Sequence, residues 1–421
     1  MLPSIRAVFV GDGSLLVRCV DAFRQAGHAV VRVASADDGV LAWAEAQGLS
    51  VERVREAPAF AGDAFDILFS VGWLQRLPPS LLQRARRLAL NFHDGPLPRY
   101  GGLNVTSWAL LEGARSHGIT WHEMTPQLDA GRIARALAFE LSPDETAYSL
   151  NAHCYEAGFQ AFLQLLDDLG RDALTLVPPA GPPRLYRRDD RPSLLATLDW
   201  RRPAPALEAL VRALDFGSYP NPLALPKFWC RGRLLVARRA RALAEGGAGA
   251  EAAPDGALAT PDAAPAAPGT VLAAGPALWR VRAGEGVLEL DGLQALDGGP
   301  LPQPQVGERL ERLDPQALEL EREDVPGGDL GEGQPTVPVH RSGHPAQAAL
   351  IQRQGQVIRL RPPLDLDKGD RAAAPGNQVD FPARCLHALC QDAPALAAQI
   401  PGGEPLTPPS ASFASTAFWP W

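Results

Sequence analysis

An asparagine, a histidine and an aspartate stand in this chain where they could act together on one reacting carbon. Asn91 and His93 lie in the run 91–98, and Asp129 follows 36 residues after the histidine. An asparagine amide can donate to an oxyanion, an imidazole can accept or relay a proton, and a carboxylate can orient the imidazole. Each residue type alone is also common in turns and caps, so only the ordered set predicts catalysis.

The residues around this trio extend the pattern. Tyr100–Asn104 follow a Gly-Pro-Leu-Pro turn, and an apolar helix, the run Gly118–Met124 and then Leu128–Gly131 come next. This order resembles the catalytic signature of the 10-formyltetrahydrofolate-dependent formyltransferases. The resemblance covers about residues 5–315. It implies an enzyme that transfers a formyl group from 10-formyltetrahydrofolate to a primary amine.

Formyl transfer requires an amine to attack the formyl carbon, so that an oxyanion forms before the folate nitrogen leaves. The side chain of Asn91 is expected to donate to that oxyanion. His93 could hydrogen-bond the oxyanion as imidazolium or take the proton of the amine as imidazole, and the sequence leaves both roles open. Asp129 is expected to raise the pKa of the histidine by pairing with it and to position a proton-carrying water.

A second segment supplies the expected folate contacts. The run 71–78 resembles the family loop that surrounds the pterin ring. Trp73 is expected to form a wall of this pocket, and the backbone contacts are expected from Leu74, Gln75 and Leu77. Leu128 and Gly131 would close the other side of the ring. The alternative is a plain loop that leads into a helix over 79–86.

The first half of the chain alternates apolar runs with amphipathic stretches. Buried strands are expected at 5–10, 30–33, 65–70 and 88–92, with helices at 14–26, 37–47 and 79–86. This alternation predicts βαβ units and a parallel sheet, with Asn91 and His93 at the carboxyl end of a central strand. A strand at 118–124 and a helix at 146–169 follow. Gly11-x-Gly13 lacks the third glycine of a dinucleotide site, because position 16 is leucine.

The resemblance implies an α/β fold with two domains, a Rossmann-like parallel sheet followed by a smaller OB-like β-barrel. We expect the catalytic domain at 1–177, a proline-rich linker at 178–195 and the barrel at 196–318. A helix at 204–214 and strands at 234–237, 269–273, 278–282 and 287–293 are expected in the barrel. Residues 240–267 form an Ala/Gly/Pro-rich insertion, and 319–421 a low-complexity tail; both are expected to be disordered.

Composition excludes several classes of function. The formal net charge of -8 argues against a general nucleic-acid binder. The five cysteines form no even framework, which favours reduced thiols in a cytoplasmic protein. Cys385 and Cys390 flank His387, but without a second pair they do not predict a metal site. No apolar run is long enough to cross a membrane, and no membrane partner is expected.

The residues of three motifs favour one class of formyl acceptor over the others. The runs 91–100, 120–124 and 215–222 resemble formyltransferase domains of nonribosomal peptide synthetases, which implies an aminoacyl carrier protein as partner. Residues 34–49 hold three acids and no Lys or Arg, which argues against tRNA, although 184–240 hold twelve Lys or Arg against five Asp or Glu. The alternatives are an amino-sugar nucleotide, a hydroxyornithine-like amine, methionyl-tRNA, a formyltetrahydrofolate hydrolase and a non-catalytic docking module.

Overall fold

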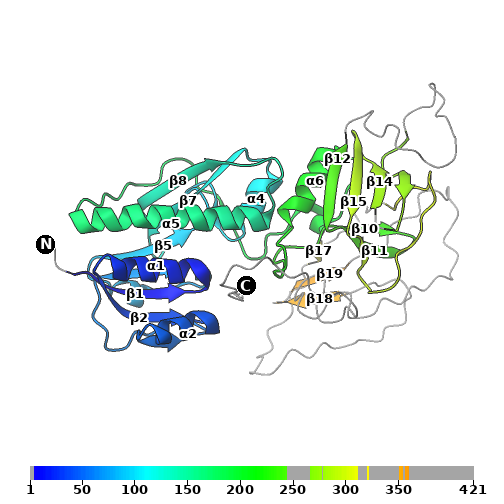
Figure 1. The fold of residues 1–421 in the computed structure, drawn as a ribbon. Helices are drawn as coiled ribbons and strands as arrows, with labels where there is room; N and C mark the ends of the chain where they lie inside the picture. Colours follow the sequence, from blue (N-terminus) through cyan, green and yellow to red (C-terminus); the bar gives the residue numbers. More distant parts are fainter. Residues whose placement is uncertain are drawn as a thin grey trace. The chain divides into compact units, whose positions relative to one another are not determined.

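The chain folds into two compact units (Figure 1). The computed structural model describes residues 4–243, 266–276 and 278–311, with three short strands further on. Of these residues, the first unit takes 4–190 and 215–222, and the second takes 191–214 and those from 223 onward. The predicted site residues all belong to the first unit.

A seven-stranded mixed sheet forms the centre of the first unit, in the order β3-β2-β1-β4-β5-β7-β8. Its strands are β1 (Arg6–Gly11), β2 (Ala29–Ser35), β3 (Val51–Arg53), β4 (Ile67–Val71), β5 (Leu88–His93), β7 (Ser116–Glu123) and β8 (Ile133–Glu140). The first five are parallel, whereas β5 pairs with β7, and β7 with β8, in antiparallel fashion. The α/β prediction is confirmed, and the antiparallel edge is an addition to it.

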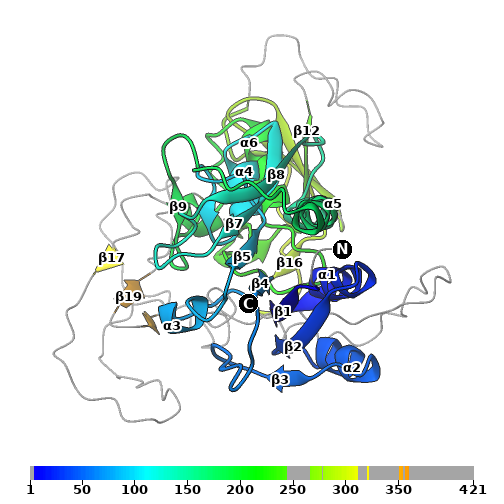
Figure 2. The same cartoon turned by 90° about the vertical axis from the view of Figure 1, so that its left-hand side faces the viewer.

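Helices pack on this sheet. They are α1 (Gly13–Gln25), α2 (Asp38–Ala46), α3 (Pro79–Leu82), α4 (Val105–Leu111) and α5 (Ala147–Arg171). Helix α5 packs against both α1 and β7, and Figure 2 shows α1 and α5 side by side. Between them and the sheet, Phe69 makes edge contacts with Phe23, Trp121 and Phe162. This aromatic core ties β4 and β7 to α5, and so fixes the strand ends that bear the site.

Two helix boundaries differ from the sequence prediction. Helix α1 begins at Gly13, with Asp12 as its N-cap residue, rather than at residue 14. The Asp12 carboxylate does not cap α1, because it accepts hydrogen bonds from the Ser35 hydroxyl at 2.6 Å and from two backbone N–H groups beyond β2. Helix α3 ends at Leu82 rather than Arg86, since the N–H groups of Arg84 and Ala85 bond within the turn, and that of Arg86 bonds to the Phe65 carbonyl ahead of β4.

The segment expected to be a linker packs on the first unit. Within it, β9 (Leu185–Tyr186) pairs in parallel with β6 (Gly101–Gly102). The side chain of Tyr186 is buried. A proline-rich composition marks a connection, but it does not reveal that one tyrosine in that connection is anchored.

The second unit is built from α6 (Ala204–Ala213), the 3-10 turn Ser193–Ala196 and small antiparallel sheets, whose strands are β10 (Lys227–Cys230), β11 (Arg233–Val236), β12 (Arg239–Leu243), β13 (Val271–Ala274), β14 (Leu278–Arg282), β15 (Val287–Asp291) and β16 (Gln294–Ala295). Trp200, Phe228 and Trp279 form its buried aromatic centre. These sheets are compatible with the expected barrel.

Two segments expected to be disordered contain strands. Strand β12 extends to Leu243, because its last residues pair with β15; the rest of the predicted insertion up to Pro265 lies outside the described residues. In the predicted tail, β17 (Leu320–Glu321), β18 (Leu350–Arg353) and β19 (Gln356–Arg359) form a three-stranded sheet. Other tail residues, including Cys385, His387 and Cys390, lie outside the described part.

Candidate active site

The predicted catalytic residues meet where β5 ends. Asn91 and His93 lie on β5, and the register with β7 places His122 opposite Asn91 and Thr120 opposite His93. Asp129 lies on the loop between β7 and β8, with a positive φ of 49°. The sheet therefore brings the amide, two imidazoles and the carboxylate to one edge.

His122 is the centre of this cluster, although the sequence pattern named only Asn91, His93 and Asp129. Its Nδ1 lies 2.9 Å from the carbonyl oxygen of Glu123, so this nitrogen carries the proton and donates. Its Nε2 then accepts from Nδ2 of Asn91 at 3.2 Å. The pair fixes which way the Asn91 amide faces and leaves the second N–H of Nδ2 available to another acceptor.

His122 is held neutral by its surroundings. Burial and the nearby His93 lower the pKa of His122 to about 4, against the opposing effects of Asp129 and the Glu123 carbonyl. At neutral pH its Nε2 is therefore a lone-pair acceptor for Asn91, as the hydrogen-bond geometry requires.

Asp129 contacts His122, whereas the sequence prediction paired it with His93. One carboxylate oxygen lies 3.6 Å from Nε2 of His122, and the other accepts from the backbone N–H of Gly102 at 2.7 Å. The buried His93 donates its Nε2 proton to the carbonyl oxygen of Tyr100 at 2.5 Å. Its Nδ1 lies 3.9 Å from the nearer carboxylate oxygen of Asp94. The two imidazole centroids are 6.2 Å apart.

The expected folate loop joins apolar side chains to one unmatched donor. Trp73 is buried beside the sheet, and its indole N–H is among the buried polar groups without a hydrogen-bond partner in the described chain. Leu74 is exposed, Leu77 packs on the same apolar cluster, and the Gln75 side chain donates to the Arg55 carbonyl at 2.7 Å. Trp73 therefore packs inside this apolar core, and Leu74 is the residue of the loop that exposes an apolar side chain.

The other two expected folate residues lie on the loop beyond β7. Leu128 exposes its side chain to solvent. Gly131 is packed so closely on Glu123 that a Cβ atom there would lie 1.8 Å from the Glu123 carbonyl oxygen. Gly131 therefore lets the loop turn back against the end of β7, which also places Asp129.

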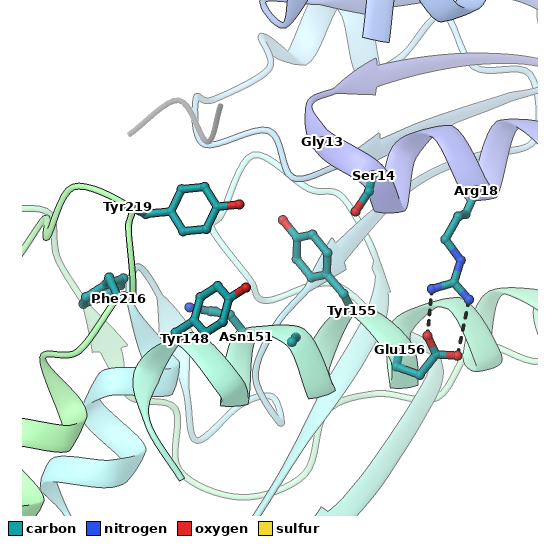
Figure 3. A pocket seen from close by; sticks show the side chains of 10 residues that line it. Gly13, Ser14, Arg18, Tyr148, Asn151, Tyr155, Glu156, Phe216 and Tyr219 are labelled. Atoms are coloured by element: carbon teal, nitrogen blue, oxygen red, sulfur yellow. Dashed lines mark hydrogen bonds and ion pairs between the residues drawn. The ribbon is translucent and has the colours of Figure 1, made fainter. Parts of the chain in front are cut away.

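A pocket of about 270 Å³ opens between α1, α5 and residues 215–222 (Figure 3). Its aromatic lining consists of Tyr148, Tyr155, Phe216 and Tyr219. The hydroxyl groups of the three tyrosines point toward one space, which Ser14 faces from α1 (Figure 3). Burial raises the pKa of Tyr155 well above its usual range, so its hydroxyl is a neutral hydrogen-bonding group.

Within the described residues, no group of His, Cys, Asp and Glu side chains is arranged to hold a metal ion. Cys19, Cys154 and Cys230 are free and buried there. The helices of this described part include none that is long and apolar enough to cross a membrane.

Comparisons with known proteins match this arrangement. A family model described as formyl transferase matches residues 58–166. A methionyl-tRNA formyltransferase of Anaeromyxobacter dehalogenans is 30% identical over 259 residues, covering 56% of this chain and 80% of that enzyme. The chain belongs to the formyltransferase family. A second relative of the same name, from Parvibaculum lavamentivorans, is 28% identical over 69% of this chain and 92% of its own length.

The fold of this formyltransferase also matches a solved sugar 3N-formyltransferase, WlaRD, whose structure contains dTDP and 5-N-formyltetrahydrofolate. The TM-score is 0.51 at 14% identity, over 69% of this chain and 98% of the other. As a member of the family, the enzyme transfers a formyl group from a folate donor to an amine.

The formyltransferase should lose stability in acid through His122. Because folding lowers the pKa of His122 from 6.5 to about 4, the stability that depends on the neutral ring is present above pH 6.5 and is lost as the pH falls towards 4. The unfolding free energy of the wild type should fall more steeply in this interval than that of His122→Gln, by up to about 1.4 kcal/mol per pH unit. Urea unfolding at stepped pH measures both slopes, and equal slopes would contradict the assignment.

Proposed function

We propose that Asn91, His93 and Asp129 carry out formyl transfer to the amino group of an aminoacyl carrier protein, which enters through the tyrosine-lined pocket. The observation that carries the catalytic part is the Asn91–His122 hydrogen bond. This bond orients the second amide N–H of Asn91 at the end of β5, where it can donate a hydrogen bond to a developing oxyanion.

The three side chains divide the proton and charge changes between them. Asn91 donates to the oxygen of the tetrahedral intermediate as the new bond between nitrogen and formyl carbon forms. His93, whose Nε2 proton is committed to the Tyr100 carbonyl, accepts the proton of the attacking amine at Nδ1. Asp129 uses its oxygen that is not bonded to Gly102 to orient a water that carries the proton to the departing folate nitrogen.

The folate donor fits between the two predicted loops. On one side, Leu74 exposes an apolar side chain, and Trp73 and Leu77 pack in the core behind it. On the other side, Leu128 presents an exposed apolar side chain, and Gly131 keeps its loop close to β7. We infer that Leu74, Gln75 and Leu77 contact the pterin through their backbone groups, because the Gln75 side chain is already bonded to Arg55.

The pocket adjoins the expected folate loop through Tyr155, whose hydroxyl oxygen would lie 3.7 Å from a Cβ atom at Gly72. The Tyr155 ring packs at 5.9 Å on Phe92, whose side chain faces the other side of β5 from those of Asn91 and His93. Tyr148 and Tyr219 stack at 5.9 Å, and the backbone N–H of Tyr148 bonds to Asp215, so residues 215–222 form one wall. Aromatic faces with hydroxyl groups suit the side chain and carbonyl of an aminoacyl group.

Charge pairing weakens the case for tRNA as acceptor. Of the twelve Lys and Arg residues in 184–240, six form ion pairs with acids, namely Arg184, Arg201, Arg212, Arg231, Arg233 and Arg239. Lys227 is buried against backbone carbonyls. A tRNA site needs cations that are free to meet phosphates, so this pairing reduces the basic surface that the sequence count implied.

Methionyl-tRNA is the second candidate acceptor. The observation in its favour is that the curated relatives described above are named methionyl-tRNA formyltransferases. This candidate predicts that formylation is strongly inhibited by added salt, because counterion release makes binding to phosphates salt-dependent.

A panel of acceptors tests the proposal. The purified enzyme is incubated with 10-formyltetrahydrofolate and one of four acceptors: an aminoacyl carrier protein, methionyl-tRNA, an amino-sugar nucleotide or a free amino acid. Mass spectrometry then detects the added formyl group. We expect product on the carrier protein, and Tyr148→Ala should lower its yield by about tenfold. Product on methionyl-tRNA alone would replace the first candidate with the second, and formate release without any product would indicate a hydrolase.

A further inference from the structure

We propose that residues 184–186, which we call the strap, position His93 for catalysis although they do not touch the reacting groups. Tyr186 is the main positioning residue, and it acts through the backbone of Tyr100. This inference rests on the proposed role of His93.

The strap is hydrogen-bonded at both ends to residues 98–103, the segment that lies next to His93 and Asp129. The Arg184 N–H donates to the Pro98 carbonyl, and the Arg184 carbonyl accepts from Gly101, both at 2.9 Å. The Tyr186 carbonyl accepts from the N–H of Leu103, also at 2.9 Å. At Gly102, with a φ of 93°, a Cβ atom would lie 2.0 Å from the Tyr186 carbonyl oxygen, so this close approach requires glycine.

Side-chain contacts also hold the strap against residues 98–103. The Tyr186 ring stacks between Trp108 at 5.0 Å and Tyr100 at 6.1 Å, with interplanar angles of 11° and 12°. Both tyrosine hydroxyls donate to Glu112, Tyr186 at 2.5 Å and Tyr100 at 2.9 Å. Arg184 forms an ion pair with the same carboxylate. One carboxylate thus joins the strap to Tyr100.

The opposite side of this segment faces the proposed reacting groups. The Tyr100 carbonyl accepts the Nε2 proton of His93, which keeps the proton on that nitrogen and leaves Nδ1 as the base. Two residues on, the Gly102 N–H donates to the Asp129 carboxylate. The segment lies between the strap and the site, so a loose strap would displace the Tyr100 carbonyl and free the imidazole to rotate.

The test compares Tyr186→Ala in two backgrounds of the full chain, with Arg187→Ala as control. Arg187 is the next residue and its side chain is exposed. In the wild-type background, Tyr186→Ala should lower kcat by about tenfold or more, while the KM for 10-formyltetrahydrofolate changes less than about twofold. In the His93→Ala background, the further loss should shrink below about threefold, because the group that the strap positions is gone. Arg187→Ala should leave kcat unchanged.

Each other outcome is decisive. Equal losses in the two backgrounds would show that Tyr186 acts on folding or on another group, and an unchanged kcat in Tyr186→Ala would also overturn the inference.

If Tyr186→Ala does not fold, Tyr186→Phe replaces it. This variant keeps the ring and loses only the hydrogen bond to Glu112, so kcat should fall at least about threefold. An unchanged kcat in Tyr186→Phe would overturn the inference. A wild-type kcat in His93→Ala would instead overturn the proposed function, so the two failures are distinguishable.

Discussion

Replacing Asn91 by alanine is expected to lower kcat by about two to three orders of magnitude, the usual cost of removing one oxyanion donor. The loss arises because no other side-chain donor on β5 is aligned by His122 as the Asn91 amide is. The KM for the folate donor should change little, since the bond to the oxyanion exists only in the transition state. Steady-state measurement of tetrahydrofolate formation gives both constants.

The isosteric change Asn91→Asp separates the donor from the shape of the side chain. Aspartate fills the same volume but has only acceptor oxygens when ionised, so this variant should be as inactive as Asn91→Ala. Thermal unfolding should show that both variants are folded. A kcat within about threefold of wild type in Asn91→Asp would remove Asn91 from the mechanism.

The second large effect is expected at His93. His93→Ala should lower kcat by about a hundredfold or more, because the amine loses the group that takes its proton. The imidazole is buried and bonded to the Tyr100 carbonyl, which fixes the position of this base. Added imidazole should restore part of the lost rate if the deleted function is proton transfer.

The control for His93 is Asp129→Asn, which keeps the hydrogen bond from Gly102 and removes the negative charge. It should also lose about a hundredfold in kcat, but free imidazole should not rescue it. Rescue of both variants, or wild-type activity in His93→Ala, would contradict the proposed division of roles.

Much of the first unit could be predicted because its signals are local. The buried runs 5–10, 65–70 and 88–92 each correspond to a strand in the structure, and Thr146 caps a long helix close to the expected bounds. The direction of β7 could not be predicted in this way. Residues 118–124 show that a strand exists, but only the sheet determines that it runs antiparallel to β5.

In the candidate site, too, contacts between distant segments could not be predicted from the sequence. Asn91, His93 and Asp129 were predicted from their order, and the structure brings them to one edge of the sheet. His122 was missed because an apolar strand context predicts a core residue, whereas its register opposite Asn91 depends on pairing between distant segments. Tyr186 was missed for a similar reason, since its partner strand is a pair of glycines more than eighty residues earlier.

The most direct test of formyl transfer by this site is a single-turnover measurement of tetrahydrofolate formation from 10-formyltetrahydrofolate, with and without the aminoacyl carrier protein, in wild type and Asn91→Ala. The proposed mechanism predicts that the amine accelerates turnover in the wild type and that Asn91→Ala abolishes most of this acceleration. Turnover that is independent of every amine, or an acceleration that survives in Asn91→Ala, would contradict it.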